Sequence, residues 1–84
     1  MEHAVELMEK TWNRWHTDGW VLTVVRDADG RFTYSASHYD QPLASQVPAG
    51  GLAEAQHTAE DIVRNSGHRC LGPCSYWVAD PPDE

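Results

Sequence analysis

The chain has 84 residues, which is enough for one compact domain and too few for two independent hydrophobic cores. Apolar residues make up 40% of the chain and charged residues 23%, so the composition is that of a folded protein and excludes general disorder. Thirteen acidic residues outnumber six basic ones, and the net charge of −7 repels phosphate at long range. We therefore expect no nucleic-acid partner.

The N-terminal stretch lacks the basic residues of a secretion signal. The apolar runs of the whole sequence are far shorter than the ~18 residues of a membrane-spanning helix. We therefore expect a soluble, cytoplasmic protein with no membrane partner.

Residues 2–16 carry large apolar side chains at helical spacing. Val5, Met8, Trp12 and Trp15 follow one another at steps of three and four residues. This spacing places the four side chains on one face of a helix. The pattern predicts an amphipathic helix over residues 2–16, with both tryptophans facing the core.

Residues 20–26 and 31–38 indicate the two strands of a hairpin. Residues 20–26 are rich in β-branched and aromatic side chains, and residues 31–38 alternate between apolar and small polar side chains. Gly30 supplies the positive φ that a short turn with a bulge needs. If Leu22 pairs with Ala36 and Val24 pairs with Tyr34, one face of the hairpin is apolar. We expect that core face to comprise Trp20, Leu22, Val24, Phe32, Tyr34 and Ala36.

The remaining chain is predicted in four parts. Residues 39–51 contain two prolines and two glycines, which favour a loop, with one short strand as the alternative. Residues 52–66 have alanines and aliphatic side chains at helical spacing and predict a second helix, capped by Gly67. Residues 75–78 indicate a short final strand, and residues 80–84 an unstructured acidic, proline-containing tail.

These elements predict an α+β fold in a single domain over residues 1–79. Two helices pack on one side of a small antiparallel sheet built on the 20–38 hairpin. The predicted order is helix, two strands, an optional strand, helix and an optional final strand. This arrangement lets each apolar stripe be buried against another.

Three residues that can bind metals lie close together after the second predicted helix: His68, Cys70 and Cys74. Zinc uses such ligands, but a structural site needs four, and the spacing between the two cysteines is three residues rather than the usual two. A fourth ligand would have to come from His3, His16, His38, an acidic side chain or another subunit. The leading interpretation is a packed pair of free thiols without a metal or cofactor, and the alternatives are a zinc site or a redox or local disulfide pair.

No catalytic constellation is predicted from the sequence. Ser35, Ser37, His38 and Asp40 lie close together, but side chains on a strand alternate between its faces and no oxyanion loop follows.

We therefore lean against an enzyme and expect a non-catalytic protein-interaction or regulatory module with a protein partner. The alternative function is a small zinc-binding or thiol-redox protein that uses His68, Cys70 and Cys74. A weak homodimer is also predicted, either through the apolar Val21 and Val25 on the second face of the hairpin or through its exposed edge strand.

Overall fold

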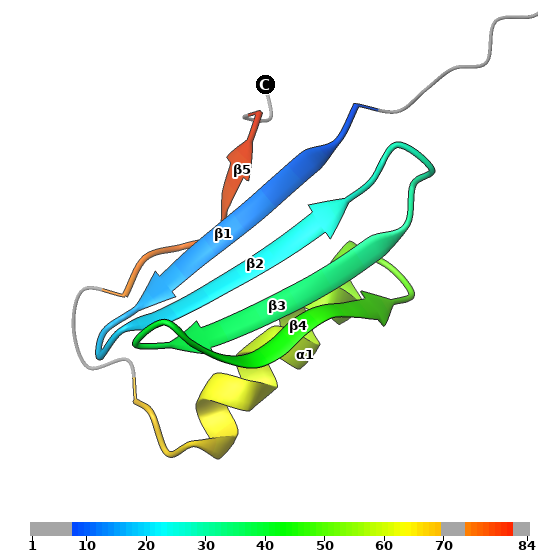
Figure 1. Ribbon diagram of the computed structural model, residues 1–84. Coiled ribbons are helices and arrows are strands. Elements are labelled where there is room, and N and C mark those ends of the chain that lie inside the picture. Colours follow the sequence, from blue (N-terminus) through cyan, green and yellow to red (C-terminus); the bar gives the residue numbers. More distant parts are fainter. Residues whose placement is uncertain (1–7, 70–73, 82–84) are drawn as a thin grey trace, which may run out of the picture.

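The computed structural model describes residues 8–69 and 74–81, which form an antiparallel sheet covered on one face by a helix (Figure 1). The strands are β1 (Lys10–His16), β2 (Trp20–Arg26), β3 (Phe32–His38), β4 (Gln41–Ala49) and β5 (Val78–Asp80). The helix α1 (Leu52–Asn65) lies between β4 and β5 in the chain. The protein is thus a small α+β domain with a five-stranded antiparallel sheet and, among the described residues, one helix.

The strand order across the sheet is β4-β3-β2-β1-β5. The first four strands form a meander in which each strand pairs with its neighbour in the chain. After α1 the chain returns to the opposite edge of the sheet, where β5 pairs with β1 through Trp12 and Ala79. The two ends of the described chain therefore lie side by side (Figure 1).

The central hairpin has the predicted register. Leu22 lies opposite Ala36 and Val24 opposite Tyr34. The Asp27 carboxylate accepts hydrogen bonds from the backbone N–H groups of Asp29 and Arg31, which closes the turn. The predicted pairing of these strands is therefore confirmed.

The helix predicted over residues 2–16 is wrong in its described part, because Lys10–His16 is the strand β1. Residues 1–7 lie outside the described residues. Trp12 and Trp15 fall on opposite faces of the strand, so Trp12 is buried and Trp15 remains about half exposed. This segment forms a strand because pairing with β2 and β5 satisfies its backbone hydrogen bonds on both sides. Threonine and tryptophan also favour a pleated, half-buried position.

The segment predicted as a loop with an optional short strand contains the nine-residue strand β4. Pro42 and Pro48 are tolerated because β4 is an edge strand, where one row of backbone groups needs no partner. A register shift opposite Ala36 and a left-handed φ of 49° at Gln46 mark an irregularity in the strand.

The second predicted helix is confirmed as α1, which ends within one residue of the predicted boundary. The predicted final strand lies later, at Val78–Asp80, and reaches the first residue of the segment predicted as an unstructured tail. Residues 82–84 lie outside the described residues. Helix α1 is too short and too polar to cross a membrane, and the described part of the chain contains no other helix.

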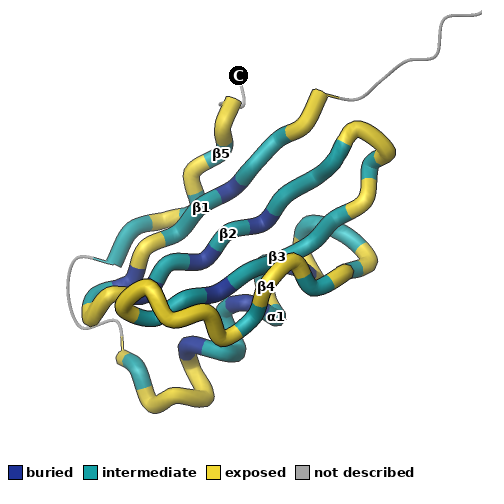
Figure 2. Tube along the Cα trace, viewed as in Figure 1, coloured by how far each residue is buried: buried dark blue, intermediate teal, exposed yellow. Residues whose placement is uncertain are grey.

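The core lies between α1 and the covered face of the sheet (Figure 2). Leu22 and Val24 on β2 are its largest fully buried side chains, and they pack against the small Ala55 and Ala59 of the helix. Trp77, from the segment before β5, packs against the same core. The C-terminal segment therefore adds an aromatic side chain to the core that the sheet and helix form.

Gly19, in the turn between β1 and β2, is a position where a side chain is not tolerated. Its φ is +79°, and an added Cβ would lie 2.5 Å from the ring of Tyr39. We expect Gly19→Ala to reduce the free energy of unfolding by about 2 kcal/mol, because an L-residue is strained in this conformation and the Tyr39 ring must move. Thermal unfolding followed by circular dichroism measures the change.

Gly51→Ala is the matched control for this substitution. Gly51 has an extended backbone, and an added Cβ meets nothing within 4 Å. An equal loss of stability in the two variants would contradict the role assigned to the turn.

Candidate functional site

Two histidines and a cysteine from three separate parts of the chain meet at the end of the sheet where β1 stops. His16 is the last residue of β1, His68 follows α1, and Cys74 precedes β5. One potential ligand atom from each of the three side chains lies within 4.8 Å of the other two. We call this group the His-His-Cys cluster.

His16 is the one buried polar residue in the described core, and its side chain is only 2% exposed. It lies opposite Trp20 in the sheet, on the face that α1 covers. Glu60 of α1 places Oε1 3.2 Å from His16 Nε2 and 3.1 Å from the Arg14 guanidinium. This carboxylate favours the tautomer with its proton on Nε2, which makes Nδ1 the nitrogen that carries a lone pair.

His68 is positioned by the end of the helix. Gly67 adopts a φ of +90° and its N–H donates to the carbonyl of Arg64, which turns the chain out of α1. The His68 side chain is 4% exposed, and its ring stands edge-on to that of His16 with 5.3 Å between the centroids. Its Nδ1 lies 3.8 Å from the carboxylate of Asp18 in the β1–β2 turn.

Cys74 is held against β1 by the residue that follows it. Ser75 exchanges hydrogen bonds with the backbone of Trp15, and its carbonyl accepts one from the Arg14 side chain. The Cys74 sulfur then accepts a 3.4 Å hydrogen bond from the backbone N–H of Thr17. This contact stabilises negative charge on the sulfur, as a thiolate ligand requires.

The distance between Cys74 and His68 fits a metal site. Cys74 Sγ lies 3.6 Å from His68 Nε2. Ligands at zinc bond lengths on a tetrahedron are separated by about 3.5 Å, so these two atoms already stand at a ligand-to-ligand spacing. A cavity of about 110 Å³ lined in part by His16, Glu60 and His68 adjoins them.

Each histidine of the cluster also has a carboxylate near it. Glu60 lies beside His16 and Asp18 lies beside His68. Histidines that bind metals commonly donate their second N–H to such a group, which fixes the ring and makes the ligating nitrogen a better donor. The arrangement around His16 is the closer match, because its 3.2 Å distance is within hydrogen-bond range whereas 3.8 Å is not.

The structure brings together only part of the predicted ligand set. His68 and Cys74 lie in the cluster, while Cys70 and His3 fall outside the described residues. His38 lies elsewhere, stacked on Trp20 with 4.3 Å between the ring centroids. Ser35, considered as part of a catalytic set, accepts a hydrogen bond from the backbone of Gln46 and stabilises the sheet edge.

His16 is the member of the cluster that sequence reasoning did not single out, because it appeared only as one of several possible sources of a fourth ligand. The helix predicted over residues 2–16 gave no reason to place it near His68. Recognition of β1 as a strand would have placed His16 opposite Trp20, on the face covered by the second helix.

Comparison with known proteins gives no assignment, because the chain matches no known family model, no curated protein and no solved structure.

Proposed function

We propose that this chain is a small zinc-binding module whose ion is held by His16, His68 and Cys74. The observation that carries the proposal is the convergence of two buried imidazoles and a thiol within 4.8 Å. Imidazole nitrogen and thiolate sulfur are donor atoms that zinc commonly uses, and the cluster brings them together from three separate segments of the chain. A cytoplasmic location belongs to the same proposal, since a reducing compartment keeps Cys74 available as a ligand.

The donor set favours zinc over other common metals. Calcium and magnesium prefer oxygen ligands, whereas imidazole nitrogen and thiolate sulfur together are typical of zinc. Three protein donors leave one position of a tetrahedron for a fourth ligand. Cys70, a candidate ligand in the zinc alternative from the sequence, lies outside the described residues, and a single substitution tests whether it contributes.

In this proposal the ion is mainly structural. It would join the end of β1, the exit of α1 and the segment before β5, which are far apart in the sequence. A small domain has a limited core, and a metal is one of the ways in which such domains gain stability.

We expect the protein purified without chelator to contain about one zinc per chain, in contrast to the metal-free thiol pair preferred from the sequence. Elemental analysis measures the stoichiometry. His16→Gln, His68→Gln and Cys74→Ser should each reduce it strongly, because each removes one donor. Cobalt(II) in place of zinc should give a thiolate-to-cobalt charge-transfer band together with the intense visible bands of tetrahedral cobalt.

His57→Gln is the matched control, because His57 lies exposed on α1 and pairs with Asp61, remote from the cluster. It should retain the metal. Cys70→Ser tests the sequence-based ligand prediction. A wild-type protein that takes up neither zinc nor cobalt would refute the proposal without reference to any variant.

A second candidate function is thiol chemistry at Cys74. The observation that favours it is the succession of Cys74, His68 and Asp18, with 3.6 Å and 3.8 Å between the facing atoms. It ranks second because the distance from Asp18 is too long for the hydrogen bond that would orient the imidazole. Rapid alkylation of Cys74 in metal-free protein, with no zinc uptake, would favour this function over zinc binding.

The protein-interaction module expected from the sequence stays a prediction, as do the protein partner and the weak homodimer. A zinc-stabilised domain is compatible with such a role, since an ion can support a binding surface without taking part in it. The predicted dimer surface is the sheet face opposite α1, where Val21 lies beside the half-exposed Trp15.

A further inference from the structure

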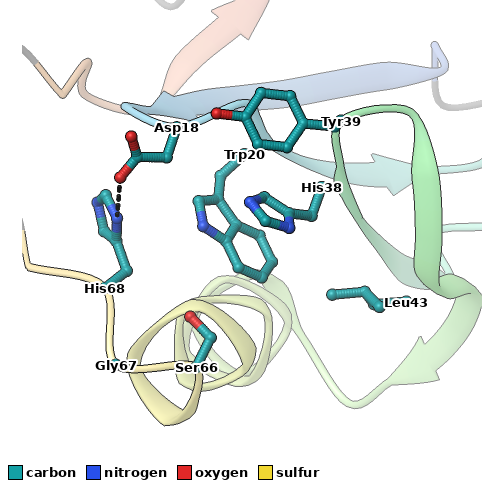
Figure 3. Close-up of a pocket in the computed structure, with 8 residues that line it drawn as sticks. All are labelled: Asp18, Trp20, His38, Tyr39, Leu43, Ser66, Gly67 and His68. Carbon is teal, nitrogen blue, oxygen red and sulfur yellow. Dashed lines mark ion pairs between the residues drawn. The ribbon is translucent and has the colours of Figure 1, made fainter.

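A pocket of about 570 Å³ lies beside the His-His-Cys cluster, between the exit of α1 and the turns at one end of the sheet (Figure 3). Its size is within the range of small-ligand sites. The side chains that matter for its chemistry are those of Asp18, Trp20, His38, Tyr39, Leu43 and His68.

Three aromatic rings lie next to one another along one side of this pocket. Buried Trp20 is stacked on His38, with 4.3 Å between the centroids and 20° between the planes. The ring of Tyr39 is tilted by 49° against that of His38, with 4.7 Å between the centroids. Tyr39 is the exposed member of this row, and 69% of its surface is accessible.

Neither burial nor the preference of its turn explains why a tyrosine occupies position 39. It has a φ of 49° in the two-residue connection between β3 and β4, where asparagine, aspartate and glycine are preferred. The backbone N–H of Tyr39 donates to the carbonyl of Gly19, and the absence of a Cβ there lets the ring lie against the β1–β2 turn. The fold thus holds an exposed aromatic ring next to Asp18.

Asp18 gives this pocket a negative charge. Its side chain is 73% exposed, and its 3.8 Å separation from His68 is longer than a hydrogen bond. No lysine or arginine is among the described residues that line the pocket. The chain as a whole carries a net charge of −7. The expected ligand is therefore a cation that can also use an aromatic surface.

We propose that this pocket binds a guanidinium group, with Asp18 as its ion-pair partner and Tyr39 as its stacking surface. A planar guanidinium can donate two parallel hydrogen bonds to a carboxylate and can lie flat on an aromatic ring, which an ammonium group cannot do. Leu43, which is half exposed, provides an apolar contact for the alkyl stem of an arginine side chain. The inference goes beyond the zinc site and does not require it.

The test is a titration of the intact protein, as purified without chelator, with N-acetyl-arginine-N-methylamide, followed by NMR through the indole N–H of Trp20 and the backbone signals of Asp18 and Tyr39. The citrulline analogue has nearly the same shape without the charge and should not bind. Equal binding of the citrulline or lysine analogue would overturn the proposal. Absence of any shift with the arginine compound would also overturn it.

Two pairs of variants assign the contacts. Asp18→Asn should weaken binding about fivefold, the upper range for an exposed ion pair. Asp18 has a left-handed φ of 67°, which asparagine also tolerates. Asp29→Asn, in an exposed turn away from the pocket, is its control.

Tyr39→Leu should weaken binding about threefold, and Tyr76→Leu controls for loss of an exposed tyrosine. Equal effects within either pair would contradict the assigned contact.

The source of the guanidinium group is distinguished by a peptide with a central arginine. Binding of the peptide at least tenfold tighter than the amide assigns the pocket to a partner protein, and equal binding assigns it to a small guanidine compound. Zinc content is measured separately on the same samples, so failure of the zinc proposal and failure of this one remain distinguishable.

Discussion

Removal of zinc with a chelator is expected to lower the thermal unfolding midpoint of the protein by about 20 °C. An ion present at a thousandfold excess over its dissociation constant stabilises the folded state by about 4 kcal/mol, and each kcal/mol corresponds to about 4–8 °C in a domain of this size. His68 contacts the Cys74 sulfur at 3.6 Å, the Asp18 carboxylate at 3.8 Å and the edge of the His16 ring, and an ion would add a stronger link among these segments. Calorimetry with and without chelator measures the shift.

Cys74→Ser provides the internal control for this experiment. The variant should unfold near the temperature of the chelated wild type and should no longer respond to chelator. His57→Gln should respond like the wild type, since His57 is exposed on α1. An unchanged midpoint after complete removal of the metal would show that the ion does not stabilise the fold.

Leu22→Ala is expected to destabilise the zinc-loaded protein by about 3 kcal/mol, the range found when a buried leucine is truncated. Leu22 is fully buried in β2, with β1 and β3 on either side. Two of its packing neighbours, Ala36 and Ala59, are already small and cannot extend into the space left behind. Because a paired strand also cannot shift inward, the cavity should persist.

Chemical denaturation with zinc held constant measures this loss. Leu43→Ala is the matched control, because it removes the same atoms from a half-exposed side chain and should change stability by less than about 0.5 kcal/mol. Similar losses in the two variants would mean that the core is not centred on β2.

The elements that sequence reasoning predicted correctly are those whose pattern depends on near neighbours. The register of β2 against β3 follows from a short turn at Gly30 and from alternation on both strands. Helix α1 follows from alanines at helical spacing and from Gly67 at its end. In both cases the local preference and the final packing agree.

The elements that were misread are those decided by distant partners. Trp12 and Trp15 fit a helical period, and only pairing with β2 and β5 places them on opposite faces. Strand β4 contains two prolines, which are acceptable only because it lies at the sheet edge. The cluster was missed in part for the same reason, since the position of His16 depends on β1 being a strand.

The pairing of β1 with the C-terminal segment also determines the order in which parts of the protein can form. The meander and α1 are built from neighbouring pieces of chain, whereas Ser75 reaches Trp15 across sixty residues. Contacts between nearby residues close faster because less chain entropy is lost. In the zinc proposal, an ion that needs both His16 and Cys74 would therefore be captured after β1 to β4 and α1 have formed. On the ribosome, a nascent chain could acquire it only once Cys74 had emerged, so metal uptake would report that synthesis has passed this residue.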